Sequence, residues 1–361
     1  MLTDDEYIHR ALELAARARG RTTPNPMVGA LVVAPDGTVV GHGYHARAGE
    51  PHAEVHALDE AGAAARGATL YCTLEPCCHT GRTPPCAPRI VDAGIRRVVA
   101  SVEDPNPQVA GGGVRLLREH GIEVRVGPGR DDALRLNRPF FSAVRRKRPF
   151  VMVKAAVSLD GRIAAAGGER ARLTSARANR RSQSLRAEVD AVGVGSGTVL
   201  ADDPLLTARE VYRVRPLVRV VFDRRLRVSP NARLFGTADQ GPIVIATRQG
   251  DDPGWGGRRE ALEQAGARML VARDAGLLPI LEALTAGHDV QSLLLEGGAA
   301  LHAAAAAEGL VDAVRVIVAP RVLGPHGVPW VRWPRLSAAG PHSVEPCGPD
   351  VIIDCDVHWT D

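Results

Sequence analysis

Four side chains in the first quarter of the chain could together activate water on a metal ion. His52, Cys77 and Cys86 offer one imidazole and two thiolates, which zinc prefers, and three protein ligands leave a fourth tetrahedral position open for water. A bound zinc ion lowers the pKa of that water from about 16 to about 7. Glu54 lies two residues after His52, at the start of the same expected helix, where it can exchange protons with the water. The pattern therefore predicts a catalytic zinc centre with Glu54 as its proton carrier.

The spacing of the two cysteines departs from the H-x-E…P-C-x-x-C signature of zinc deaminases, because eight residues separate Cys77 from Cys86. Two prolines directly before Cys86 predict a stiff approach to a short helix with this cysteine in its first turn, where the helix dipole stabilises a thiolate. Cys78 and His79 are alternative ligands, although adjacent cysteines rarely close one tetrahedral site. A closed structural zinc knot is a further alternative; it would need a fourth ligand and would not need Glu54.

The length and composition of the chain indicate the class of protein to which these residues belong. The chain has 361 residues, 45% of them hydrophobic and 24% charged, which is typical of two globular domains. The net charge of +4 and the small number of aromatic residues (five Phe, four Trp, four Tyr) argue against a nucleic-acid partner. Neither a membrane span nor a secretory signal is expected from the apolar pattern, so we expect a cytoplasmic protein.

Helical and extended patterns alternate along both halves of the chain and predict an α/β fold for each. A capping box, Thr3 to Glu6, predicts the first helix, and residues 131–144 predict the last helix of the first domain. The basic run of residues 145–149 ends in proline and is interpreted as a solvated hinge. We therefore expect domains at residues 1–146 and 149–361.

The second half has weaker chemical signals than the first, and no G-x-G-x-x-G fingerprint in the Rossmann register. Residues 193–198 (GVGSGT) follow an expected strand and could form either a phosphate-binding loop or a simple turn. Residues 293–298 (LLLEGG) run from a strand into a helix at Ala299, and a helix N-terminus after two glycines suits an anion. This pattern favours a pyrophosphate-containing ligand.

Four motifs in the first half closely resemble the bifunctional deaminase–reductase family of riboflavin biosynthesis. They are TPNPMVG at 23–29, HAE at 52–54, TLEPCCHTGRTPPC at 73–86 and EDPNP at 103–107. That family carries its second zinc cysteine at this longer spacing. The one departure is Cys78, where the family commonly has serine, and it adds a thiol that could oxidise or compete for metal. In the second half KAAVSLDG at 154–161, TVLADDP at 198–204 and EGG at 296–298 resemble the family's reductase domain.

The resemblance implies a cytidine-deaminase-like three-layer domain followed by a dihydrofolate-reductase-like domain that uses NADPH. The implied reactions are zinc-dependent hydrolytic deamination of 2,5-diamino-6-ribosylamino-4(3H)-pyrimidinone 5′-phosphate and then reduction of its ribosyl group to ribityl. The implied partners are this phosphorylated pyrimidine and further copies of the chain in a homo-oligomer, with no nucleic acid and no membrane.

Site residues are carried over position by position. For the cofactor the resemblance implies Ala156, Arg172, Thr198, Asp202 and the Gly298–Ala304 turn, which includes Ala299 and Ala300. For the substrate it implies Asn25, Arg170, Arg186, Leu206, Arg209 and Glu296. Structural alternatives remain open, because Asp202 could be a turn residue, Arg186 a solvated helix arginine and Leu206 a core residue. Lys154 could lie near cofactor or substrate phosphates, or its stem could only pack.

One segment departs from the family, which often reads Gly-Glu-Ser-x-Trp before Thr174. Arg170 and Arg172 replace the serine and the tryptophan. Guanidinium groups can stack and can bind phosphate, so the function can survive the change. A deaminase with an impaired reductase domain is therefore one alternative. The others are a deaminase acting on a free base, a nucleoside or tRNA, and a non-catalytic binding protein with a structural zinc ion.

Overall fold

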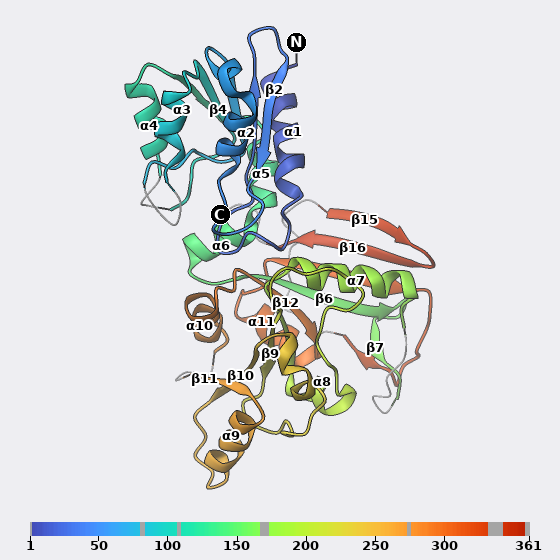
Figure 1. Cartoon of the computed structure of the whole chain (residues 1–361). Coiled ribbons are helices and arrows are strands. Elements are labelled where there is room, and N and C mark those ends of the chain that lie inside the picture. The colour runs from blue at the N-terminus through green and yellow to red at the C-terminus, as the bar shows by residue number, and fades with distance from the viewer. Residues whose placement is uncertain are drawn as a thin grey trace. The chain divides into compact units, whose positions relative to one another are not determined.

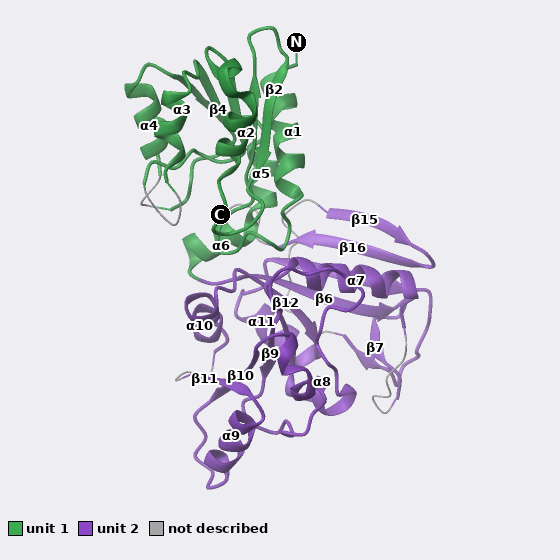
Figure 2. Cartoon of the chain, in the orientation of Figure 1, with its two compact units in different colours: residues 1–147 green, residues 148–361 purple. Residues whose placement is uncertain are grey.

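The computed structural model of the chain describes residues 2–79, 84–106, 110–166, 173–272, 276–330 and 342–357. Its contacts divide the chain into two units, Met1–Lys147 (unit 1) and Arg148–Asp361 (unit 2), which are coloured separately in Figure 2. Within the described ranges, every helix is too short or too polar to cross a membrane. The predicted positions Arg170 and Arg172 lie outside the described residues.

Unit 1 is built on a five-stranded sheet in the order β2-β1-β3-β4-β5 (Figure 1). β1 pairs antiparallel with both of its neighbours, whereas β3, β4 and β5 are parallel. The strands are β1 (Gly29–Val33), β2 (Val39–Tyr44), β3 (Thr69–Cys72), β4 (Arg97–Ala100) and β5 (Glu123–Val126). The helices are α1 (Asp4–Ala16), α2 (Ala53–Ala61), α3 (Cys86–Asp92), α4 (Gly112–Glu119), α5 (Arg130–Leu136) and α6 (Arg138–Arg146), and a 3-10 turn, Gly62–Ala65, follows α2.

Glycines in β1 and β2 let two helices lie directly against opposite faces of this sheet. A Cβ on Gly29 would lie 2.0 Å from the carbonyl oxygen of Ala11 in α1. Gly29 pairs with Tyr44 in β2, and Gly43 is the neighbouring residue of that strand. Gly43 therefore faces the opposite side of the sheet, where a Cβ on it would lie 2.4 Å from the carbonyl oxygen of Ala53. The close approach at Gly43 fixes where α2 begins.

The capping box predicted at the N-terminus is confirmed. The Thr3 side chain accepts from the backbone N–H of Glu6, and the Glu6 carboxylate accepts from the N–H of Thr3 at 2.7 Å. The single helix predicted over residues 131–144 is wrong, because the chain breaks at Asn137 into α5 and α6. The amide of buried Asn137 pairs with both backbone groups of Met27, at 2.8 and 2.9 Å. This pairing anchors the segment that carries Asn25.

Unit 2 is built on a nine-stranded sheet in the order β11-β10-β9-β8-β12-β6-β13-β16-β15, parallel from β11 to β13, with β16 and β15 added antiparallel. Its strands are β6 (Phe150–Ser158), β8 (Ala191–Gly195), β9 (Val218–Phe222), β10 (Ile243–Arg248), β11 (Ala267–Ala272), β12 (Ser292–Gly297), β13 (Ala313–Ala319), β15 (His342–Cys347) and β16 (Asp350–Asp356); β7 (Arg162–Ala164) and β14 (Val328–Pro329) pair separately. The helices are α7 (Ala176–Glu188), α8 (Ser196–Asp202), α9 (Trp255–Gln264), α10 (Leu278–His288) and α11 (Ala299–Ala307), with a 3-10 turn at Phe235–Gln240.

The glycine run at 193–198 is not a loop. Gly193 and Gly195 lie within β8, and α8 begins directly after them. A Cβ on Gly193 would lie 2.9 Å from Leu295 and 3.0 Å from Phe222, so this glycine serves side-chain packing.

The basic run at 145–149 is not a solvated hinge throughout, because Arg148 is buried in unit 2. Its guanidinium forms a bidentate ion pair with Asp312, with N–O distances of 2.6 and 2.8 Å. The same carboxylate accepts from the backbone N–H of Val151 at 2.8 Å. α6 extends through the first part of the run, to Arg146. Arginine at 148 therefore belongs to the core contacts of unit 2.

Replacing Arg148 with alanine should destabilise unit 2 by about 3–5 kcal/mol, because the buried, bidentate ion pair with Asp312 would be broken. All four tryptophans follow residue 148, so tryptophan fluorescence during urea unfolding reports on unit 2. Arg248→Ala, at the exposed end of β10, is the matched control and should change the free energy of unfolding by less than about 0.5 kcal/mol. Equal effects of the two substitutions would contradict the assignment.

Candidate active sites

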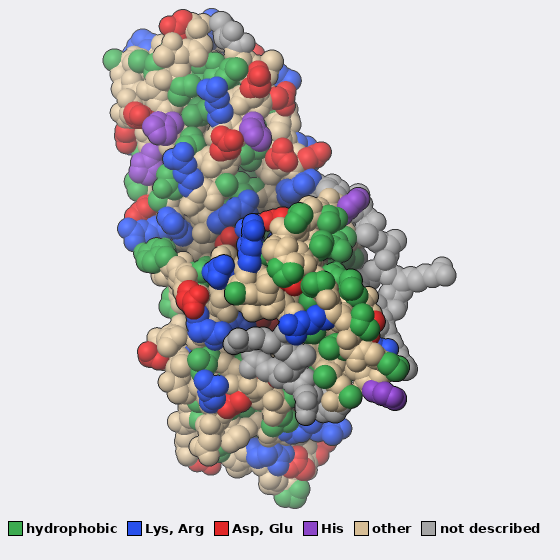
Figure 3. Space-filling view, turned by 90° about the vertical axis from the view of Figure 1, so that its right-hand side faces the viewer, with side chains coloured by type: hydrophobic (Ala, Val, Ile, Leu, Met, Phe, Trp, Pro, Cys, Tyr) green, Lys and Arg blue, Asp and Glu red, His purple; other side chains and the backbone are tan. Residues whose placement is uncertain are grey.

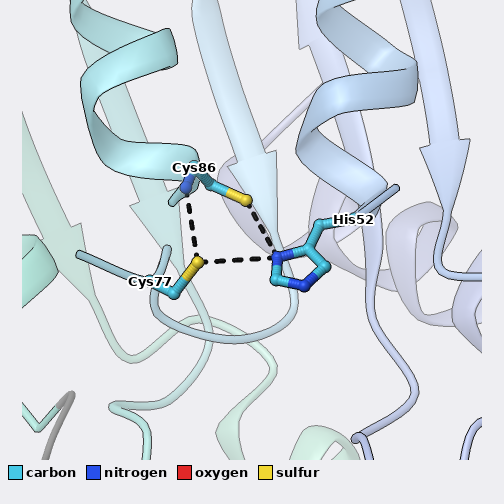
Figure 4. Close-up of side chains that lie close together, drawn as sticks. All are labelled: His52, Cys77 and Cys86. Atoms are coloured by element: carbon cyan, nitrogen blue, oxygen red, sulfur yellow. Dashed lines mark hydrogen bonds between the residues drawn. The ribbon is translucent and has the colours of Figure 1, made fainter. Parts of the chain in front are cut away.

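The three predicted metal ligands converge in unit 1 (Figure 4). His52 caps the start of α2, Cys86 is the first residue of α3, and Cys77 lies in the segment after β3. His52 Nδ1 lies 3.1 Å from Cys86 Sγ and 3.5 Å from Cys77 Sγ. Tetrahedral zinc with ordinary bond lengths places nitrogen and sulfur ligands about 3.6 Å apart, so the cluster fits zinc.

Hydrogen bonds at the start of α3 prepare one of the thiols for metal binding. The side chain of Cys86 and its backbone N–H, 3.3 Å from Cys77 Sγ, both hydrogen-bond to Cys77, and together with His52 they lower the pKa of the Cys77 thiol. A thiolate is the form that binds a metal ion. These contacts therefore favour the thiolate form of Cys77.

Glu54 lies in the first turn of α2, with a side chain that is only 3% exposed. Burial raises the pKa of its carboxyl to about 7, against the opposing charge of His52. The carboxyl also hydrogen-bonds to the side chain of Cys86, so it lies beside the ligand cluster. A carboxyl group with a pKa near neutrality can both accept and release a proton.

The alternative ligands are not in the cluster. In the described part of the chain, the one group of metal-binding side chains close enough to share an ion is His52, Cys77 and Cys86. Cys78 lies against the start of α4, where a Cβ on Gly112 would be 2.6 Å from its sulfur. Three ligands leave a position open, which a closed structural knot does not.

Asn25 is held by a histidine that the sequence motifs do not include. The amide nitrogen of Asn25 lies 3.0 Å from Nε2 of His45, and Nδ1 of His45 lies 3.1 Å from the carbonyl oxygen of Pro51. Burial lowers the pKa of His45, which favours a neutral ring that donates to Pro51 and accepts from Asn25. This orientation leaves the amide oxygen of Asn25 available to a ligand. The His45 and His52 rings are 5.4 Å apart, so Asn25 lies near the metal ligands.

In unit 2, two of the predicted substrate residues form a buried ion pair. Arg186 of α7 binds both carboxylate oxygens of Glu296 at the end of β12, at 2.8 and 2.5 Å, and also donates to the carbonyl oxygen of Thr207 at 2.7 Å. Burial alone would raise the pKa of Glu296, but Arg186 outweighs it and holds that pKa at about 2. Arg186 is thus not a solvated helix arginine.

Two further titratable groups surround this pair. Burial lowers the pKa of Lys154, although the charge of Glu296 opposes the effect. His302 of α11 was not found from the sequence, because no short motif encodes its contacts: Nε2 lies 3.2 Å from the carbonyl oxygen of Leu295, and Nδ1 accepts from the Trp330 indole at 3.1 Å. Burial lowers the pKa of His302 to about 4, so its ring is neutral at neutral pH.

The predicted cofactor residues Ala156, Thr198 and Gly298 lie at or just after the carboxyl ends of neighbouring parallel strands, where α/β sheets commonly bind ligands. Thr198 packs on the turn before α11, since a Cβ on Gly297 would be 2.7 Å from its hydroxyl oxygen. Gly298, with φ of 85°, begins α11, and the first amides of a helix, here those of Ala299 and Ala300, have no partner within it. Ala156 lies near the end of β6, two strands from β8 in the sheet order.

Asp202, Leu206 and Arg209 are the remaining predicted site residues that the structure describes. Asp202 ends α8. Leu206 has a buried side chain in the core and a φ of 56°, so its backbone is what it can offer to a ligand. Arg209 is exposed, and its backbone N–H donates to Gln183 at 2.8 Å.

Comparison with known families agrees with the division of the chain into two units. Residues 1–102 match the cytidine and deoxycytidylate deaminase zinc-binding region, and residues 149–353 match the RibD C-terminal domain. A zinc-ligand cluster within an α/β deaminase fold, followed by that second domain, defines a zinc-dependent deaminase joined to a reductase. The cytidine-deaminase-like first domain and the reductase second domain are thus confirmed.

Curated relatives and solved structures extend over nearly the whole chain. The riboflavin biosynthesis protein RibD of Escherichia coli is 42% identical over 337 residues, covering 90% of this chain and 89% of the relative. That of Aquifex aeolicus is 41% identical over 321 residues, covering 89% and 88%. The structure of Acinetobacter baumannii RibD is 36% identical with a TM-score of 0.86, covering 98% of this chain and 99% of that one. This chain belongs to the RibD family.

Replacing Cys77, Cys78 and Cys86 with serine one at a time should show which of these cysteines bind zinc. We expect about one zinc ion per chain in the unmodified protein and in Cys78→Ser, because Cys78 points toward α4. Cys77→Ser and Cys86→Ser should each lose most of the zinc, since two ligands do not hold the ion. Metal analysis after dialysis measures this. Zinc loss in Cys78→Ser would contradict the ligand assignment.

Proposed function

We propose that this chain deaminates 2,5-diamino-6-ribosylamino-4(3H)-pyrimidinone 5′-phosphate and then reduces the ribosyl group, giving 5-amino-6-ribitylamino-uracil 5′-phosphate. The cluster of His52, Cys77 and Cys86 beside buried Glu54 carries the proposal for the first step. For the pair of steps, support comes from a Thermotoga maritima protein described as a diaminohydroxyphosphoribosylaminopyrimidine deaminase/5-amino-6-(5-phosphoribosylamino)uracil reductase. It is 32% identical with a TM-score of 0.84, covering 98% of this chain and 99% of that one.

In unit 1 three side chains hold the metal and two act on the substrate. A zinc ion held by His52, Cys77 and Cys86 would supply activated water at neutral pH. Glu54 would then take a proton from the attacking water and deliver protons to the ring nitrogen and to the departing ammonia; its buried, near-neutral carboxyl suits both directions. Asn25, oriented by His45, accepts a hydrogen bond from the pyrimidine or its ribose.

In unit 2 the chain's task is to bind and orient, because NADPH supplies the reducing equivalents. The helix start at Gly298, Ala299 and Ala300 suits the cofactor pyrophosphate, with Thr198 packed beside it. The fixed ion pair of Arg186 and Glu296 presents a rigid polar surface to the substrate. The other residues assigned by resemblance are Ala156, Arg172 and Asp202 for the cofactor and Arg170, Leu206 and Arg209 for the substrate.

The mass of the product tests both steps in one incubation with zinc and NADPH. Replacing an amino group by oxygen adds about 1 Da, and reduction adds about 2 Da more. We expect a gain of about 3 Da in full and of about 1 Da when NADPH is omitted. An unchanged mass with zinc bound would refute the substrate assignment, and a stop at about 1 Da in the presence of NADPH would refute the reductase assignment.

Glu54→Gln should lower the deamination rate by roughly 10²–10⁴-fold, because the amide cannot exchange protons with the water. Zinc content should stay unchanged, since Glu54 is not a ligand. Reduction of separately supplied deaminated intermediate should continue at the unmodified rate and so serves as the folding control. Undiminished deamination would favour a structural zinc ion instead.

We propose further that the enzyme is a homo-oligomer formed through one face of β13, β16 and β15. Register places Val316 beside Ile353 and Val344, and Val318 beside Val351, on one face. The opposite face is covered by α7, which packs on Ile317 and Ile352 (cluster of Ala178, Ile317, Cys347 and Ile352). In the described ranges these valines and Ile353 belong to no buried cluster, and Val344 is 62% exposed.

A second copy is the occupant that this surface fits. Figure 3 shows hydrophobic side chains gathered on one side of the molecule. β15 is also an edge strand whose residues are mostly exposed, and an exposed strand edge is readily covered by the same edge of another copy.

Val344→Asp should shift the full-length protein from a dimer or larger oligomer to a monomer, because a carboxylate would be buried in the apolar contact. Light scattering after size-exclusion chromatography measures the mass. Leu278→Asp is the control; it alters an apolar side chain that is 39% exposed on α10, and should leave the mass unchanged. A monomeric unmodified protein would refute the proposal.

We assign the enzyme to the cytoplasm. All six cysteines are free thiols, which a reducing compartment maintains.

A further inference from the structure

Glu75 has a buried carboxylate that takes no part in the chemistry assigned above. It lies two residues before Cys77 and is only 3% exposed. One carboxylate oxygen accepts from the backbone N–H groups of Asp104 at 3.2 Å and Gly111 at 3.0 Å, and the other accepts from Val114 at 3.0 Å. Three chain segments, after β3, after β4 and at the start of α4, therefore meet on one side chain.

The start of α4 is pressed against the same cysteine segment. A Cβ on Gly113 would lie 1.8 Å from the carbonyl oxygen of Pro76, the residue between Glu75 and Cys77. Gly111 and Val114 are the N-cap and third positions of α4, whose N–H groups have no partner within the helix, so the carboxylate satisfies them and complements the helix dipole. The contact is therefore close in space and charge-assisted.

The backbone of Glu75 is fixed as well. Its N–H donates to the carbonyl oxygen of Val102 at 2.9 Å, directly after β4. Asp104 in turn accepts from the N–H of Asn106 at 2.8 Å, and its carboxyl lies within electrostatic range of Cys77. The segment from 102 to 106 is thereby held beside the Cys77 ligand.

We propose that Glu75 is a positioning residue for the zinc centre. Its carboxylate fastens the start of α4 and residue 104 to the segment that carries Cys77, and so holds this ligand in place. Groups that orient metal ligands from behind typically alter metal affinity or activity by about 10–100-fold when they are replaced. This inference rests on the zinc deaminase function proposed above.

Glu75→Gln is the discriminating variant. Glutamine has one acceptor oxygen, so its NH₂ group would face a backbone N–H and at least one of the three bonds would be lost. In the full-length protein we expect the zinc dissociation constant, measured by competition with a coloured chelator, to rise about 10–100-fold. Amide hydrogen exchange in residues 104–106 and 110–114 should become faster. Deamination kcat at saturating zinc should fall, with reduction of supplied intermediate unchanged.

Glu119→Gln is the matched control, because it makes the same substitution at the exposed far end of α4. It should leave zinc affinity and both rates within about twofold of the unmodified protein. A Glu75→Gln protein with unmodified zinc affinity and deamination kcat would overturn the proposal. If the unmodified chain binds no zinc or does not deaminate, the proposed function fails instead.

Gly113→Ala disturbs the same contact from the side of α4 and keeps the Glu75 carboxylate. It therefore tests the proposal if the Glu75→Gln protein fails to fold. The added Cβ must displace the helix start from Pro76. We expect weaker zinc binding and lower deamination, with normal reduction. A folded Gly113→Ala protein with unmodified zinc affinity would also overturn the proposal.

Discussion

A three-ligand metal site in unit 1 depends on two helices whose N-terminal ends bring their side chains together. His52 is the N-cap residue of α2 and Cys86 is the first residue of α3, and their donor atoms are 3.1 Å apart. This meeting requires α2 to lie flush on the sheet, which Gly43 permits by having no side chain against Ala53. Both helix dipoles then point their positive ends at the site, which favours a thiolate and a carboxylate in it.

The site in unit 2 is organised by charge. Arg186 and Glu296 are 110 residues apart in sequence and come from a helix and a strand end, yet they form a bidentate pair with little exposure to water. The pair fixes α7 relative to β12, and Lys154 lies within range of the same charges. Both units therefore place ionised groups in low-dielectric surroundings, the first through helix starts and a metal, the second through paired side chains.

Short sequence patterns predicted the features of this molecule that depend on interactions between neighbouring residues. The capping box at Thr3, the position of Cys86 in a first helical turn and the strand-to-helix passage at Gly298 follow from residues within one turn of each other. The break at Asn137 and the burial of Arg148 did not follow, because each depends on a partner far along the chain, Met27 and Asp312. His45 and His302 were missed for the same reason: their roles come from contacts that no short motif encodes.

The ion pair of Arg148 and Asp312 also defines where the two enzymes can be divided. The basic run reads as one linker, but its arginine at 148 is part of the second unit, and the boundary falls after Lys147. A reductase half produced on its own must therefore begin no later than Arg148 to keep this ion pair. A cut one residue later would remove the guanidinium that forms a bidentate pair with buried Asp312 in the second unit.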